Sequence, residues 1–267
     1  QKSMQEAYSL YAAGFSRINW HIWSSQWAPQ SLWTSGSQKW PGFQSMPLFQ
    51  TWGMREPAYA EYAELNQHLG RVQELLREGK SRSDIGMVYM KYGQNLCFST
   101  TAEEDMWMQR HDYMLFPSME LQENGYTYDY FSPELLKSDN VYYDSENGTL
   151  ELAGYKALVL WQNWLTIDGA EAIRDMAKQG LKVVIVDGAA VQTPYNDHDD
   201  AALKTVMDEI NSLSNVRLAE NADHVLEALQ DLGVQPYAGY ESQQLLSQVR
   251  QDENGNEYLY VYNYCDG

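Results

Sequence analysis

The sequence is short of basic residues. Its 267 residues include 18 Lys and Arg against 37 Asp and Glu, which gives a formal net charge of −19 at pH 7. Nucleic acids and anionic membrane surfaces are bound through stripes of Lys and Arg, and no such stripe is available here. We therefore expect no nucleic-acid partner and no membrane partner.

Long hydrophobic runs are also missing. No window approaches the roughly 18 consecutive apolar residues that span a bilayer, and the N-terminus lacks the basic-then-apolar pattern of a signal peptide. Both ends look cut, because the chain begins in "QKSMQEAYSLYAAGF", which reads as mid-helix, and stops just after a strand-like run. We expect a piece of a larger polypeptide.

Cysteine is nearly absent. Cys97 and Cys265 share no short metal-binding spacing, which disfavours a thiolate zinc site, and whether they pair is open. The tripeptide Asn147-Gly148-Thr149 would accept a glycan in a secreted eukaryotic protein, but such tripeptides often arise by chance. The residues predict no metal site and no cofactor.

Strands and helices alternate in the second part of the sequence. Strands are expected at 85–90, 126–130, 155–160, 181–186 and 216–218, with helices at 103–124, 133–137, 168–179, 200–213 and 221–232 and a final hairpin at 244–250 and 257–263. This alternation predicts an open, mostly parallel sheet covered by helices on both faces. The boundary with the first part falls at 81–83.

Phosphate-binding fingerprints are missing from this α/β part. "KYGQNLC" follows one strand and "DGAAVQTP" follows another, and neither holds the glycines of a dinucleotide or nucleotide loop. Asp187-Gly188-Ala189-Ala190 stands where an amidotransferase would place a nucleophilic cysteine. We expect a fold of the flavodoxin or amidotransferase kind without that chemistry.

The run "PYNDHDD", residues 194–200, allows two interpretations. Its three aspartates and His198 could form a cation site, or Asp199 and Asp200 could favour the positive end of a helix dipole. The helix start is the favoured interpretation.

The first part of the sequence is rich in tryptophan. Helices are expected at 3–13 and 58–78, the second ending at Gly79, with a strand at 17–23 and a long loop at 24–57. The stretch "FSRINWHIWSSQWAPQSLW" holds four tryptophans beside polar side chains.

If the strand lies in a closed parallel barrel, its carboxyl end faces the site side. Aromatic faces stack on sugar rings, while His, Asn and Gln bond the hydroxyls around them. The predicted substrate-binding residues are Asn19, His21, Trp23, Trp27 and Trp40. For any single tryptophan, packing of the loop onto the barrel is an equally good explanation.

The combination of these stretches resembles a known family. "YAAGFSRINWHIW", "WPGF", "WGMREPAYAEYAELNQHLGRVQELLREGKSRSDIGMVY", "GYTYDYFSPELL" and "YKALVLW" are similar to the late portion of glycoside hydrolase family 106, the α-L-rhamnosidase-like enzymes. The resemblance implies that residues 1–82 are the C-terminal units of a (β/α)8 barrel. It implies that residues 83–267 form a non-catalytic, three-layer α/β domain.

The resemblance also implies a chemistry. Members hydrolyse glycosidic bonds with two carboxylic acids, with inversion and with calcium, so carbohydrate and the rest of the parent polypeptide are the expected partners and calcium is possible in the parent. The glutamates of residues 1–82 are predicted on helices or in the long loop, and none ends a strand: Glu6, Glu56, Glu61, Glu64, Glu74 and Glu78. The catalytic pair is therefore expected upstream of this chain. An extracellular or periplasmic location fits such a polysaccharide-degrading enzyme.

Two alternatives remain open at this point. The chain could be a non-catalytic carbohydrate-binding or scaffolding module, or a flavodoxin-like cofactor binder. Sugar-dependent tryptophan fluorescence or bound flavin would separate them.

Overall fold

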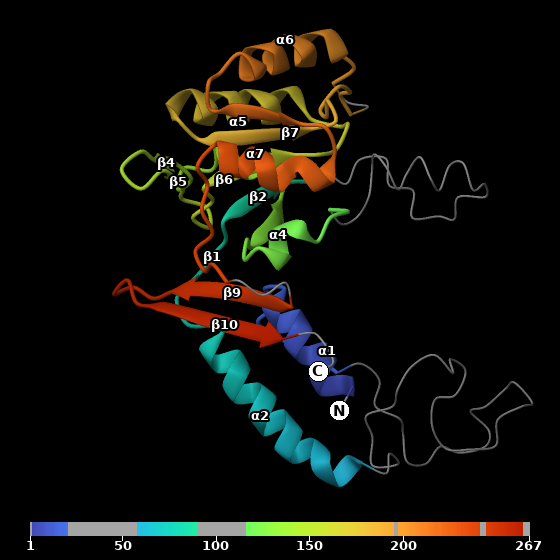
Figure 1. The fold of residues 1–267 in the computed structure, drawn as a ribbon, viewed down its shortest axis with the longest axis vertical. Coiled ribbons are helices and arrows are strands. Elements are labelled where there is room, and N and C mark those ends of the chain that lie inside the picture. The colour runs from blue at the N-terminus through green and yellow to red at the C-terminus, as the bar shows by residue number, and fades with distance from the viewer. Residues whose placement is uncertain (1, 21–57, 90–115, 195–196, 241–243, 264–267) are drawn as a thin grey trace, which may run out of the picture. The chain divides into compact units, whose positions relative to one another are not determined.

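The computed structural model of the protein divides into two compact units (Figure 1). Unit 1 comprises residues 1–11 and 15–78, and unit 2 comprises residues 12–14 and 79–267. The structure describes residues 2–20, 58–89, 116–194, 197–240 and 244–263. Within these ranges, no helix is long and apolar enough to cross a membrane.

Unit 1 holds the helices α1 (Lys2–Ala12) and α2 (Tyr62–Leu75), with the 3-10 turn η2 (Tyr59–Glu61) before α2. Both predicted helices are therefore present. The hydroxyl of Tyr8 lies 2.6 Å from His68 Nε2, and the hydroxyl of Tyr11 donates to the Leu69 carbonyl at 3.4 Å. These two bonds join successive turns of one face of α1 to one turn of α2.

Residues 15–20 do not form the strand that the alternating pattern predicts at 17–23. Instead they lie along α2, where the Ile18 amide donates to Gln73 Oε1 at 3.3 Å and the Trp20 indole donates to Asn66 Oδ1 at 2.7 Å. A strand needs a neighbouring strand to pair with, and the described residues of unit 1 contain none. The barrel portion therefore stays a prediction.

Unit 2 is built on a five-stranded parallel sheet in the order β3-β2-β6-β7-β8. Its strands are β2 (Ile85–Val88), β3 (Tyr128–Phe131), β6 (Ala157–Leu160), β7 (Lys182–Val186) and β8 (Val216–Ala219). The two apolar runs of the sequence occupy the centre as β6 and β7, where burial on both faces favours such runs. The predicted mostly parallel sheet is confirmed.

Helices cover both faces of this sheet, as Figure 1 shows. On one face lie α5 (Ile167–Gln179) and α6 (Asp200–Asn211), and on the other lie α4 (Glu120–Glu123) and α7 (Val225–Asp231), which follows η4 (Ala222–His224). Residues alternate between the faces along β6, with Leu158 and Leu160 toward α5 and α6 and Val159 toward α7.

The helix expected at 103–124 is confirmed only over Glu120–Glu123 among the described residues of that range. Residues 116–119 are not helical, and α4 begins at Glu120. Pro117 explains the break, since a proline has no amide hydrogen and obstructs the preceding helical turn. Residues 90–115 lie outside the described part of the chain.

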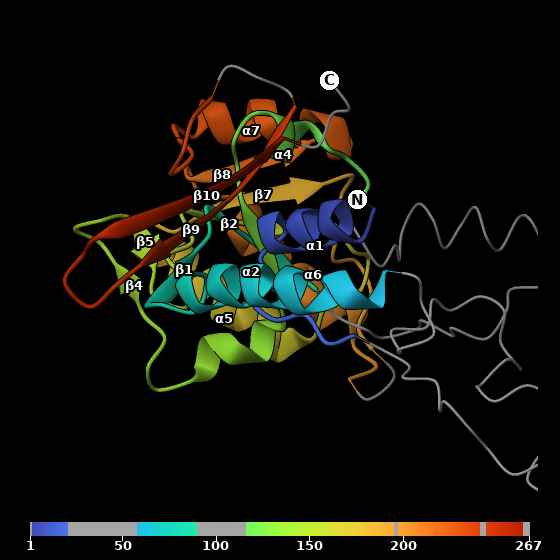
Figure 2. The same cartoon turned by 90° about the horizontal axis from the view of Figure 1, so that it is seen from below.

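Two antiparallel elements complete unit 2 (Figure 2). The predicted hairpin is β9 (Leu245–Gln251) with β10 (Glu257–Asn263), and β1 (Lys80–Arg82) adds to it as an unpredicted third strand. Gly79 does not end α2, which stops at Leu75, but precedes β1 with φ of +61°. A Cβ there would lie 2.1 Å from the Gln251 carbonyl oxygen, so only glycine fits.

A second, smaller hairpin was not expected from the pattern either. It pairs β4 (Tyr143–Asp144) with β5 (Thr149–Leu150). The 3-10 helix η3 (Pro133–Lys137) stands where a helical segment was predicted.

Candidate functional site

The predicted sugar-binding segment is described only at its start. Asn19 is exposed and makes no hydrogen bond to a described residue, while the adjacent Trp20 is fixed by Asn66 on α2. Trp20 therefore bonds to α2 within unit 1. His21, Trp23, Trp27 and Trp40 lie outside the described residues.

An aromatic cluster lies toward the carboxyl ends of the parallel strands, which sequence reasoning did not single out. Tyr89 follows β2, Tyr130 is on β3 and Trp161 follows β6; the rings of Tyr89 and Trp161 are nearly parallel, with centroids 6.5 Å apart. Phe116 and Tyr128 add edge contacts to the same cluster. The signal was an aromatic residue at or just after the end of three strands, in "MVY", "YDYF" and "LVLW".

This cluster is at the place where open α/β sheets commonly bind ligands, because strands β2 and β6 are neighbours from which the chain proceeds in opposite directions. Trp161 is, however, only 7% exposed. The Tyr130 hydroxyl accepts the Phe116 amide at 2.6 Å, and burial raises the pKa of Tyr130 above its ordinary value. The burial of Trp161 and Phe116 and the ring contacts among these residues show that the cluster packs at this end of the sheet.

Most amides of the turn after β7 donate to groups of the protein, with the exception of Gly188. The amide of Asp187 donates to Ala219, that of Ala189 to Val186 and that of Ala190 to Gln162, and the next two amides donate to Asn163. A phosphate-binding loop needs such N–H groups pointing at the ligand. Asp187 itself, with φ of 49°, occupies the position after the strand where a nucleophile would be needed.

The acidic run at 194–200 starts helices. Asp199 caps α6 by accepting the Ala202 amide at 2.9 Å, and Asp197 accepts the Ile167 amide at the start of α5. Asp200 accepts both the amide and the hydroxyl of Thr193 at 2.7 Å, and these bonds lower the pKa of Asp200. The helix-start interpretation is confirmed.

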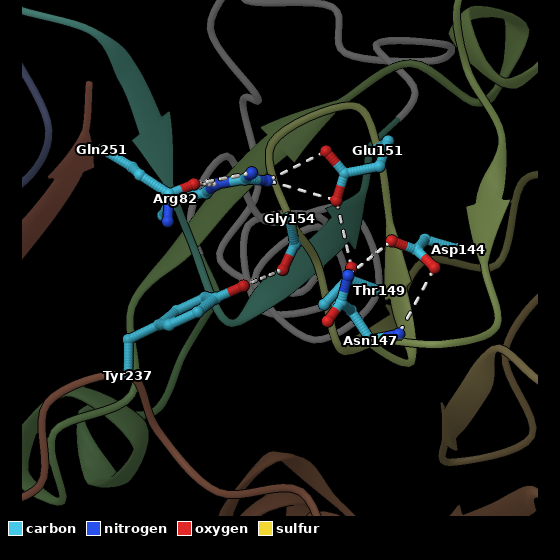
Figure 3. A network of polar contacts seen from close by, with 8 residues as sticks. All are labelled: Arg82, Asp144, Asn147, Thr149, Glu151, Gly154, Tyr237 and Gln251. Atoms are coloured by element: carbon cyan, nitrogen blue, oxygen red, sulfur yellow. Dashed lines mark hydrogen bonds and ion pairs between the residues drawn. The ribbon is translucent and has the colours of Figure 1, made fainter. Parts of the chain in front are cut away.

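A polar network ties the connection between β1 and β2 to the rest of unit 2 (Figure 3). Arg82 donates from Nη1 to both carboxylate oxygens of Glu151 at 3.2 and 3.0 Å, and from Nε and Nη2 to Gln251 Oε1. Tyr237 donates its hydroxyl to the Gly154 carbonyl at 2.7 Å. A Cβ on Gly154 would lie 2.7 Å from Arg82 Nη1, so the guanidinium fits because residue 154 has no side chain.

Asp84, two residues further, is fully buried and accepts four hydrogen bonds. Oδ1 accepts from Lys156 Nζ at 3.1 Å and from the Tyr237 amide at 2.6 Å, and Oδ2 accepts from the amide and hydroxyl of Thr127 at 2.9 Å each. Burial raises the pKa of Asp84, while the charge of Lys156 and the bonds from Thr127 oppose that shift.

The sequence match decides the family. The family model for α-L-rhamnosidases, glycoside hydrolase family 106, matches residues 22–266, which is nearly the whole chain. The chain belongs to glycoside hydrolase family 106. No curated protein matches it. Of the predicted sugar-binding residues, Asn19 and His21 precede the matched range, whereas Trp23, Trp27 and Trp40 lie inside it.

Membership of family 106 raises the question of whether Asp84 is the acid of a glycosidase, since such acids have a raised pKa. Asp84 has no exposed surface, and both its oxygens are occupied by protein donors. No substrate oxygen can reach it without unfolding this connection. The pKa of Asp84 is raised because the fold buries its carboxylate, and its hydrogen bonds hold three segments of unit 2 together.

The family resemblance implies calcium, but the described residues of this chain contain no set of side chains that could bind it. No three His, Cys, Asp or Glu side chains gather there in a way that could hold a metal ion. Asp197, Asp199 and Asp200, the carboxylates nearest in sequence to forming such a set, each accept backbone amides instead. We therefore derive no chemical step through calcium.

Proposed function

We propose that this chain is the substrate-binding wall and accessory domain of an α-L-rhamnosidase-like enzyme whose two catalytic carboxylic acids lie outside residues 1–267. The carbohydrate substrate follows from the family, whose printed description is α-L-rhamnosidase. Residues 1–82 contribute to a (β/α)8 barrel, and residues 83–267 form the α/β domain that follows it in the chain. The parent enzyme works in an extracellular or periplasmic location.

The placement of the glutamates carries this proposal. Glu6 lies on α1, while Glu64 and Glu74 lie on α2, and Glu61 and Glu78 immediately flank α2. Active-site residues of a (β/α)8 barrel stand at the carboxyl ends of strands or in the loops after them, not on the surrounding helices. Glu56 lies outside the described residues. In unit 2, Asp84 is a buried carboxylate, but both of its oxygens already accept hydrogen bonds from protein donors.

Sugar contact is assigned to Asn19, His21, Trp23, Trp27 and Trp40. Asn19 supports this role because its side chain is exposed and bonds to no described residue, while Trp20 anchors the segment beside it. An anchored backbone with an unengaged amide next to it suits hydrogen bonding to a sugar hydroxyl, and tryptophans supply the stacking faces.

The α/β domain is assigned no catalytic role. Most turn amides after β7 donate within the protein, and Asp187 stands where a nucleophile would be needed. A purely carbohydrate-binding or scaffolding function of the whole chain is the alternative, because this described turn has neither a nucleophile nor a glycine-rich phosphate loop.

Hydrolysis of an aryl α-L-rhamnoside by the purified chain tests the first assignment. We expect no turnover above buffer, because a glycosidase needs both an acid and a base. Clear turnover would contradict the placement of the catalytic pair. In that case Glu→Gln substitutions at positions 56 and 61 would locate the responsible group.

Quenching of tryptophan fluorescence by rhamnose or a rhamnoside tests the second assignment. We expect quenching that Trp23→Ala or Trp40→Ala abolishes, since a stacked sugar changes the environment of these indoles. Trp161→Phe in the other unit is the matched control and leaves the titration unchanged. A wild-type chain without quenching would favour packing as the sole role of the segment.

A further inference from the structure

Two exposed turns of unit 2 share the tripeptide Glu-Asn-Gly. Residues 146–148 connect β4 to β5, and residues 253–255 connect β9 to β10. Both asparagines are exposed, and both glycines have positive φ, +69° at Gly148 and +81° at Gly255. The residues on each side of the two asparagines are therefore the same, which makes them an internal comparison.

In water, an asparagine followed by a glycine can lose its side-chain amide through an intramolecular reaction. The glycine amide nitrogen loses its proton and attacks the asparagine side-chain carbonyl carbon; the C–N bond of the side-chain amide breaks, and ammonia leaves. The resulting five-membered imide is opened by water at either carbonyl, giving aspartate or isoaspartate. Glycine favours the attack because no Cβ hinders its nitrogen. No oxidant or reductant is required.

Asn147 is restrained against this attack by Asp144 (Figure 3). Its Nδ2 donates to Asp144 Oδ2 at 2.7 Å, so the side-chain amide must break this bond before it can turn freely. The nucleophile is held as well, since the Gly148 amide donates to the Asp144 carbonyl at 2.8 Å. Both reacting groups are thus bonded to one residue.

Asn254 lacks the side-chain restraint. Asp252, the aspartate before this turn, stands two residues before Asn254, whereas Asp144 stands three before Asn147; it uses Oδ2 to accept from Asn256 Nδ2 at 2.8 Å and from the Tyr258 hydroxyl at 3.2 Å. The Asn254 side chain bonds to no described residue. The Gly255 amide donates to the Asp252 carbonyl at 3.1 Å, and nothing lies within 4 Å of where a Cβ would stand on Gly255.

We propose that Asn254 is a site of spontaneous deamidation in this protein and that Asp144 protects Asn147 from the same reaction. The product places a new carboxylate between Asp252 and Glu257, in a turn that already carries Glu253. Isoaspartate also adds a methylene to the backbone between β9 and β10. The modified turn is then a substrate for an isoaspartyl carboxyl methyltransferase.

The experiment incubates the whole folded chain in mildly alkaline buffer and follows both peptides by digestion and mass spectrometry, with methyltransferase labelling to detect isoaspartate. Asn254 is expected to react about 2- to 12-fold faster than Asn147. This factor corresponds to one hydrogen bond of about 0.5–1.5 kcal/mol, at about 1.36 kcal/mol per tenfold in rate. The same chain unfolded in urea should lose the difference.

Two substitutions sharpen the comparison. Asp144→Ala should raise the rate at Asn147 by the same factor without changing Asn254, and Asn254→Gln should remove the fast reaction. Because the wild-type chain compares its own two turns, the test does not depend on the folding of either variant. Equal rates in the folded chain, a faster reaction at Asn147, or no reaction at Asn254 would each overturn the proposal.

Discussion

Asp84 illustrates how a single residue acquires a perturbed environment for structural reasons. Its partners come from the residue before β6, from the segment before β3 and from the connection between α7 and β9. Lys156 reaches it while also donating to the Gln235 carbonyl at 2.7 Å and lying 3.5 Å from the centre of the Tyr237 ring. The carboxylate therefore joins three separate stretches of unit 2.

Asp84→Asn should destabilise unit 2 by about 1.5–3 kcal/mol, which is the usual contribution of a hydrogen bond to a charged group. The amide can present only one acceptor oxygen, so donors on one side lose their partner. Chemical denaturation monitored by circular dichroism measures the loss. Asp168→Asn is the control, because Asp168 forms an exposed pair with Lys137 and such pairs contribute about 1 kcal/mol or less. Equal losses in both variants would contradict the role of Asp84.

Asp200 should contribute to acid sensitivity. Its hydrogen bonds from Thr193 lower its pKa in the folded chain, so the folded state binds the proton less readily than the unfolded state. The stabilisation is therefore present above the unfolded pKa of about 3.9 and is lost as the pH falls through the folded pKa.

Melting temperatures across the acid range check this expectation. Asp200→Asn, which cannot titrate, should show a smaller fall in melting temperature on acidification than the wild-type chain. Asp139→Asn, an exposed residue without a described hydrogen bond, should follow the wild type. Parallel curves for all three proteins would contradict a contribution of Asp200 to the loss of stability in acid.

At the scale of elements, β2 depends on a glycine that faces the packed side of the sheet. A Cβ on Gly86 would lie 2.8 Å from side-chain atoms of Leu158, Phe131 and Tyr155, closer than real contacts allow. Strand β2 and its neighbours can pack this closely only because residue 86 has no side chain.

Gly86→Ala should therefore cost about 1–3 kcal/mol, the usual range for overpacking a core. Denaturant midpoints give the measure. Gly70→Ala on α2 is the matched control, since nothing lies within 4 Å of its Cβ position and alanine favours a helix by up to about 1 kcal/mol. If Gly86→Ala left the denaturant midpoint unchanged, this part of the sheet would be able to relax around the added methyl group, which would contradict the prediction.

The elements also show where pattern reading succeeds. The helices α5 and α6 and the strands β6 and β7 match their predicted ranges closely, because periodicity and burial are local properties of long apolar runs. β1, β4 and β5 were missed because they are two or three residues long and exist through pairing alone. The strand expected at 17–23 carried the right alternation over 17–20 but has no described partner.

At the scale of the whole molecule, the net charge of −19 dominates. Like charges repel one another in the compact state, and salt at physiological ionic strength largely screens the repulsion between exposed charges more than about 8 Å apart. Ion pairs act in the opposite direction, but three of the seven described have both side chains about half exposed or more and contribute little. The repulsion should be the larger effect.

Adding sodium chloride from low to physiological concentration should therefore raise the melting temperature by a few degrees. Differential scanning fluorimetry over a salt series is sufficient, with an equal osmolality of sucrose as the uncharged reference. A melting temperature that falls with salt would mean that ion pairs outweigh the repulsion.

The candidate sites, like the helices and strands, could be predicted from the sequence only where they depend on neighbouring residues. The sequence predicted the helix start at Asp199 and Asp200, because it depends on neighbouring residues. It did not predict the aromatic cluster of Tyr89, Tyr130 and Trp161, since these residues meet only when three strands align. The predicted sugar contacts at His21, Trp23, Trp27 and Trp40 stay predictions.

The sequence by itself determined the family, the acidic surface and the alternation of strands and helices, because composition, motif order and periodicity are all read along the chain. Tertiary structure decided the strand order β3-β2-β6-β7-β8 and the burial of Asp84 between Thr127, Lys156 and Tyr237. Pairing and burial join residues far apart in the chain. Their partners are selected by the fit of whole surfaces, which no local pattern encodes.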